Sequence, residues 1–309
     1  MTAPTRFEID GERHYATDQA DKAYPSVTTI LGKTSSEKSK KALLNWQIKN
    51  PNGAAAAAKR GSAVHQACED YIRGKEITIE KEYQPFWEGM SKHLDKYDEF
   101  IWSEMPLRPE WKFCTGEDGI SRVWSHKYMY CGCPDLLGIR NDTVIIGDFK
   151  TSNQPYCRYY PSSNSSNRSL FTGWNKFNKC AMQLAAYAQA CKETLGVNVS
   201  CAEIIVSTPE IDQSFILNAN ELAKFQTKWL QKVRRYQEIK EEERLAKQIL
   251  KDARDELTSG NVSTKSSNET KHRCPAVKAF CFICHNWVCV VVCHWNNSYW
   301  WFVRIFVCK

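Results

Sequence analysis

Long apolar segments are missing from this chain of 309 residues. No apolar run reaches the roughly 18 residues that a membrane-spanning helix needs. The N-terminal segment lacks the apolar stretch of a secretory signal and is not Arg-rich and acid-poor like a mitochondrial presequence. We therefore expect neither a membrane partner nor secretion.

A regular cysteine framework is also missing, although the chain has 14 cysteines. Eight are scattered between Cys68 and Cys201, and only Cys131 and Cys133 lie close together in that part. The other six lie beyond residue 273. This distribution is typical of reduced thiols and argues against a disulfide-stabilised fold for the main part of the chain.

Composition divides the chain into two parts. Residues 1–258 contain the regular apolar patterns, with a core at about 24–218 and a long charged helix at 220–257. Residues 259–309 are predicted to be a polar linker followed by a tail rich in Cys and Trp, and the sequence does not indicate the role of this tail. The net charge of +7 is compatible with a nucleic-acid partner but does not require one.

The order of patterns predicts an α/β fold with a central mixed sheet flanked by helices. Helices are expected first, then a cluster of strands, then a helix, a strand and the long charged helix. Within this order a helix is expected at 84–104, and three strands are expected at 110–114, 121–126 and 130–140. A long polar loop is expected at 153–177.

The stretch "VIIGDFK" at 144–150 places two charged residues in a strand that is otherwise apolar. Asp148 and Lys150 are two residues apart, so their side chains share one face of the strand, whereas Phe149 faces the other way. Charges buried in this way are costly unless they pair or bind an ion. From this stretch alone, a structural ion pair and a functional site remain equally open.

A second acid upstream favours the functional site. Asp135 lies 13 residues before Asp148, and the turn-forming stretch "RNDT" separates two apolar runs, which predicts a strand pair with both carboxylates at one end. Two neighbouring carboxylates repel each other unless a cation lies between them. Oxygen ligands of this kind suit Mg²⁺ or Mn²⁺, and a nearby Lys can offset charge on a phosphate.

Several motifs together resemble the PD-(D/E)xK nuclease superfamily. "PD" at 134–135 and "DFK" at 148–150 match its signature. "RGSAVHQACEDYI" at 60–72, "QLAAYAQA" at 183–190 and "YPSVTTIL" at 24–31 resemble segments of the RecB-like exonuclease branch, in the group of phage and mitochondrial genome maintenance exonucleases. Their order along the chain agrees with that group.

This resemblance implies a restriction-endonuclease-like core and a metal-dependent DNA exonuclease that hydrolyses phosphodiester bonds, acting on single-stranded DNA from a free end. It implies a monomer in the cytoplasm of a bacterium or a phage-infected cell, or in mitochondria if the source is eukaryotic. It assigns catalysis to Asp135, Asp148 and Lys150. It also implies a site for Mg²⁺ or Mn²⁺ whose ligands are His65, Asp135, Asp148 and the backbone carbonyl of Phe149.

Other residues are candidates for supporting roles. In the family, the residues at Gln183 and Tyr187 help to position DNA near the metal. Arg158 and Lys176 lie in a segment, 156–180, that mixes basic and aromatic residues, a composition suited to binding single strands. Two acids complete the set as candidates to orient the site: Glu69, one turn after His65, and Glu110.

Two alternatives remain open. Some relatives carry an iron–sulfur cluster, and Cys281, Cys284 and Cys289 provide three of the four thiolates that it needs, but no cysteine precedes His65. The chain could instead be a non-catalytic DNA-binding module of the same fold, although Asp135, Asp148 and Lys150 are all present.

Overall fold

The computed structural model describes most of the chain, and the chain divides into two compact units, Met1–Lys247 and Gln248–Lys309. Each unit is considered by itself. The site residues predicted above all lie in the first unit. The described residues are 6–19, 22–116, 118–162, 167–258, 288–292 and 303–307.

A mixed sheet forms the centre of the first unit, with the strand order β11-β10-β9-β8-β4-β5. Strands β9 and β10 are parallel, and all other neighbours in this sheet are antiparallel. The strands are β4 (Glu99–Ser103), β5 (Met105–Pro106), β8 (Leu136–Arg140), β9 (Thr143–Thr151), β10 (Cys201–Ser207) and β11 (Asp212–Leu217).

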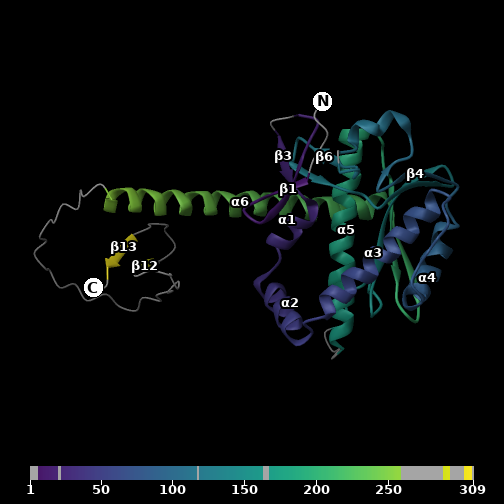
Figure 1. Ribbon diagram of the computed structural model, residues 1–309, viewed down its shortest axis with the longest axis horizontal. Coiled ribbons are helices and arrows are strands. Elements are labelled where there is room, and N and C mark those ends of the chain that lie inside the picture. Colours follow the sequence, from purple (N-terminus) through teal and green to yellow (C-terminus); the bar gives the residue numbers. More distant parts are fainter. Residues whose placement is uncertain are drawn as a thin grey trace, which may run out of the picture. The chain divides into compact units, whose positions relative to one another are not determined.

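Helices cover both faces of this sheet (Figure 1). Alternate residues of β9 belong to different apolar clusters, because successive side chains of a strand point to opposite faces. Ile145 and Phe149 pack with residues of α3 (Gly53–Ile72) and α4 (Gln84–Leu94). Ile146 packs with residues of α5 (Arg168–Leu195). Asp148 and Lys150 have the same parity as Ile146, so they belong to the α5 side of the sheet.

The parallel pair β9 and β10 is joined through α5, as a parallel connection requires a crossover. These features confirm the predicted α/β class with a mixed sheet between helices, and they are compatible with a restriction-endonuclease-like core. Helix α5 starts after Asn167, whose side chain accepts a hydrogen bond from the backbone N–H of Ser169, and it ends at Gly196 in the left-handed conformation.

The remaining elements surround this core or lie in the second unit. Residues 6–16 and 23–25 contribute a three-stranded sheet. The elements are β1 (Arg6–Ile9), β2 (Glu12–Ala16), β3 (Ala23–Pro25), α1 (Val27–Lys33), α2 (Glu37–Lys49), η1 (Lys81–Tyr83), η2 (Pro109–Cys114), β6 (Val123–Ser125), β7 (Tyr130–Gly132), α6 (Ala219–Thr258), β12 (Val288–Val292) and β13 (Val303–Val307).

Several predicted boundaries are wrong. The helix predicted at 84–104 ends at Leu94, and its last part is strand β4, where aromatic and β-branched residues favour extended backbone. The strand predicted at 110–114 is the 3-10 helix η2, which begins at Pro109 with φ already fixed by the ring. The run predicted as one strand at 130–140 is divided into β7 and β8.

The polar loop predicted at 153–177 is also shorter than expected, because α5 already begins at Arg168. In contrast, the long charged helix predicted at 220–257 is confirmed as α6 within one residue at each end. Among the helices that the structure describes, none combines the length and apolar composition that crossing a membrane requires.

The predicted tail lies mostly outside the described residues. Cys281 and Cys284, two of the candidate iron–sulfur ligands, are among the residues not described, and only the backbone of Cys289 is described, within β12. Strand β12 pairs with β13 in antiparallel orientation.

Candidate metal centre

Strand β9 carries a closely paired acid and base on its α5 side. The Asp148 side chain is completely buried, and its Oδ2 lies 2.6 Å from Nζ of Lys150. Oδ1 accepts a hydrogen bond of 3.1 Å from Nε2 of Gln183 on α5. Both carboxylate oxygens of Asp148 therefore contact fixed groups of the protein itself.

Burial and charge act in opposite directions on this pair. Burial raises the pKa of Asp148, and the positive charge of Lys150 opposes that rise. Burial alone would lower the pKa of Lys150, but the negative charges of Asp148 and Asp135 outweigh it and raise the pKa. Lys150 is consequently a protonated cation at neutral pH.

The backbone of Phe149 connects this pair to the other side of the sheet. Its N–H donates to Oδ2 of Asp135 at 2.9 Å. Its carbonyl accepts from Nζ of Lys150 at 3.1 Å and lies 3.0 Å from Nε2 of His65. Because a carbonyl only accepts, Nε2 of His65 must carry the proton, and in the neutral ring Nδ1 is left with a lone pair.

That Nδ1 atom faces two acids. It lies 3.6 Å from Oε1 of Glu104 and 3.9 Å from Oδ2 of Asp135. One ligand atom from each of these three residues lies within 4.8 Å of the other two. A lone pair and two carboxylates repel one another unless a proton or a metal ion lies among them. The burial of His65 lowers its pKa, but Asp135 and Glu104 raise it by more.

Strand pairing brings the two acids together. Asp135 directly precedes β8, and Glu104 directly follows β4, which is antiparallel to β8. The N–H of Glu104 donates to the backbone carbonyl of Asp135 at 3.2 Å. Glu104 also has a positive φ of 51°, a left-handed conformation that is uncommon outside glycine.

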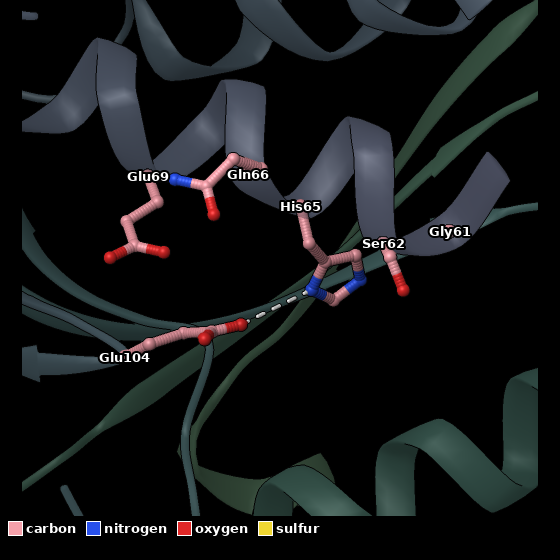
Figure 2. A pocket seen from close by; sticks show the side chains of 6 residues that line it. All are labelled: Gly61, Ser62, His65, Gln66, Glu69 and Glu104. Carbon is pink, nitrogen blue, oxygen red and sulfur yellow. Dashed lines mark ion pairs between the residues drawn. The ribbon is translucent and has the colours of Figure 1, made fainter. Parts of the chain in front are cut away.

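A pocket of about 370 Å³ opens beside the cluster. Figure 2 shows His65, Glu69 and Glu104 around it, with the ion pair between His65 and Glu104 drawn as a dashed line. Glu69 forms an ion pair with Arg73. The lining residues are Gly61, Ser62, His65, Gln66, Glu69 and Glu104.

The donor set fits Mg²⁺ or Mn²⁺. It offers one imidazole nitrogen and two carboxylates within a few ångströms, and carboxylate oxygens are the ligands that both ions prefer. Asp148 does not belong to this group, because its oxygens contact Lys150 and Gln183. Glu104 thus joins His65 and Asp135 as a candidate acidic ligand that the sequence did not single out.

Gln183 and Tyr187 lie inside the protein. Nε2 of Gln183 reaches both Oδ1 of Asp148 and Oη of Tyr187, the latter at 3.2 Å. Tyr187 is 4% exposed and packs so closely on Gly132 that a Cβ there would lie 2.1 Å from its ring. Direct contact of these two side chains with DNA does not agree with this burial. They hold Asp148 in position instead.

The other predicted site residues differ in their surroundings. Arg158 donates to the carbonyl of Ile216 at 3.0 Å and pairs with Glu221, so it joins β11 to the start of α6. This contact gives it a structural role rather than the predicted role at DNA. Glu110 is exposed on η2, and the acid that lies against His65 is Glu104 instead.

Glu104 is the residue that sequence reasoning missed. The sequence contained one signal, an acid directly after the strand-like stretch "FIWS". Glu104 follows β4 and Asp135 precedes β8, so the antiparallel pairing of these strands places the two acids at the same end. The two positions are related only through the pairing of β4 with β8, in which Ser103 stands opposite Leu136. Without that register, Glu104 is one acid among many.

Comparison of the chain with protein-family models finds no matching family. Comparison with curated proteins likewise finds no match. The function of this chain is therefore inferred from its motifs and from the geometry of the site.

Proposed function

We propose that this protein is a metal-dependent DNA exonuclease that hydrolyses phosphodiester bonds of single-stranded DNA from a free end. The observation that carries the proposal is the cluster of His65, Glu104 and Asp135, which lies beside a pocket and next to the buried pair of Asp148 and Lys150. A group of acids able to hold a cation, beside a fixed lysine, suits phosphodiester hydrolysis, because both offset negative charge on the phosphate.

The residues of the site have three different roles in this proposal. His65, Glu104 and Asp135 would hold Mg²⁺ or Mn²⁺, which when bound makes a water more acidic and neutralises phosphate charge. Lys150 remains protonated and offsets negative charge on the phosphate. Asp148 keeps Lys150 at its position through the ion pair.

Exposed aromatic residues support a single-stranded substrate. Tyr160 is 64% exposed, and its ring centroid lies 4.9 Å from that of Trp174 and 5.5 Å from that of Phe171. Tyr159 beside it is 77% exposed. Unpaired bases stack on such rings with little dependence on sequence. A strand that enters by its end can use such contacts without being opened from a duplex.

The test compares linear single-stranded DNA with a closed circle of the same sequence, each with Mg²⁺ or with EDTA. We expect Mg²⁺-dependent degradation of the linear strand to short products and survival of the circle. Equal loss of the circle would show an endonuclease. Binding without cleavage of either substrate in Mg²⁺ or Mn²⁺ would instead favour a non-catalytic DNA-binding module.

A further inference from the structure

Two cations from opposite faces of the sheet reach the turn that follows β9. Arg60 belongs to α3, and its Nη1 donates to Oδ1 of Asn153 at 2.6 Å. Lys176 belongs to α5, and its Nζ donates to Oγ of Ser152 at 3.0 Å. Ser152 and Asn153 directly follow the last residue of β9. The two helices thus direct positive charge to one short segment.

Neither cation is neutralised by the protein. Within the described ranges, neither Arg60 nor Lys176 takes part in an ion pair, and Nε of Arg60 is buried without a hydrogen-bond partner there. The guanidinium carbon of Arg60 lies 4.7 Å from the ring centroid of Phe86, which fixes its orientation. Burial lowers the pKa of both groups, and the charge of Arg60 lowers that of Lys176 further.

An anion would stabilise this arrangement. Buried or partly buried charges of like sign without partners cost free energy, because each loses hydration and repels the other. A guanidinium and an ammonium together match the oxygens of a phosphate. The hydroxyl of Ser152 provides a further polar group at the same place.

This pair of cations lies next to the pocket. Arg60 directly precedes Gly61 and Ser62, which line it, and Arg60 is five residues before His65 on α3, roughly 7.5 Å along the helix axis. A Cβ on Gly61 would lie 4.0 Å from Oγ1 of Thr151, so this turn of α3 passes close to the end of β9. A strand with one phosphate at the acidic pocket could therefore place a neighbouring phosphate at Arg60.

We propose that Arg60 and Lys176 bind a phosphate of the substrate strand adjacent to the one that is hydrolysed. This inference rests on the proposed function, since it takes DNA as the ligand. The chemistry is that of a phosphate oxyanion, which could belong to an internal phosphodiester or to a terminal phosphate. Both residues act by positioning the strand.

The test measures binding of a fluorescent single-stranded oligonucleotide in EDTA, so that no cleavage is needed. The variants are Lys176→Gln, Arg60→Gln and the charge-retaining Lys176→Arg. Lys192→Gln is the matched control, because Lys192 is an exposed lysine in the last turn of the same helix. Three oligonucleotides are compared, with a 5′-phosphate, with a 3′-phosphate or with neither.

We expect Lys176→Gln and Arg60→Gln each to weaken binding roughly tenfold. The slope of log affinity against log salt should fall by about 0.7 for each lost phosphate contact with a single strand. Lys176→Arg and Lys192→Gln should bind like the unaltered protein. The same loss with all three oligonucleotides identifies an internal phosphodiester, and a loss confined to one phosphorylated end identifies a terminal phosphate.

The two proposals fail separately. If the unaltered protein cleaves DNA but Lys176→Gln and Arg60→Gln bind with unchanged affinity and salt slope, the phosphate site is wrong and the nuclease stands. If the protein binds DNA through Arg60 and Lys176 but cleaves nothing with Mg²⁺ or Mn²⁺, the nuclease is wrong and the phosphate site stands. Lys176 remains accessible to solvent although its ammonium is partly covered, so its replacement tests the site even if Arg60→Gln unfolds.

Discussion

The two sides of strand β9 differ in how their charges are balanced. On the α5 side, Asp148 is buried and matched by Lys150 and by the amide of Gln183. On the α3 side, Glu104 and Asp135 face a single imidazole, that of His65, beside an open pocket. Only Thr151 separates Lys150 from Ser152 and Asn153, the residues to which Lys176 and Arg60 donate hydrogen bonds.

This difference separates positioning from binding. A carboxylate whose oxygens are both engaged is held in one place whether or not a ligand is present, because the protein supplies its partners. Neighbouring carboxylates without a cation of the protein between them are stabilised most when a metal ion binds. We therefore propose that the α5 side orients the site and that the α3 side binds the metal, and three variants test this division.

The largest effect is expected for Asp148→Asn. This change keeps the size of the side chain but removes the charge that holds Lys150, so cleavage should fall more than about 1,000-fold, as when a catalytic group is removed from other hydrolases. Binding of DNA in EDTA should persist. Asp142→Asn is the control, since Asp142 is exposed in the turn before β9. Equal cleavage by the two variants would limit the α5 side to a structural role.

An intermediate effect is expected for Glu104→Gln. Loss of one carboxylate at the pocket should weaken Mn²⁺ binding by about 10- to 100-fold in calorimetry. Glu110→Gln makes the same chemical change at an exposed position and should leave the affinity unaltered. If the two variants bind Mn²⁺ equally well, Glu104 is not a ligand, and the proposed metal site on the α3 side is wrong.

The smallest effect is expected for Tyr187→Phe. The variant loses one buried hydrogen bond from Gln183, so the free energy of unfolding in urea should fall by about 1 kcal/mol. DNA affinity should not change, because the ring is buried. Tyr159→Phe, at an exposed position, should leave the stability unchanged. A Tyr187→Phe variant of normal stability and weakened DNA binding would restore the direct contact that the sequence suggests.

Local patterns predicted the parts of the site that depend on local geometry. Alternation along β9 placed Asp148 and Lys150 on one face, and the turn at Asn141 and Asp142 joined β8 to β9 in an antiparallel pair. Both follow from the two-residue period of a strand and from residues that tolerate a left-handed turn. The neighbourhood of Asp135 and Asp148 was predictable for that reason.

Features that depend on how elements pack were not predictable. The i,i+4 spacing of Gln183 and Tyr187 shows that they share a face of α5 but not which face meets the sheet. That orientation is set by close contacts such as that of Gly173 with the carbonyl of Pro155, which a Cβ would approach to 2.7 Å. Glu104 likewise depends on a strand register that no short stretch of sequence contains.

The carbonyl of Phe149, which lies between His65 and Lys150, is a backbone group and does not depend on the identity of the side chain. Any amino acid at this position carries the same oxygen, so an alanine scan would register the lost packing of the aromatic ring and never the lost oxygen. The apolar side chain is thus free to vary with the packing of α3 while the chemistry is inherited unchanged. Only proline would alter the backbone pattern there, because it lacks the N–H that Asp135 accepts.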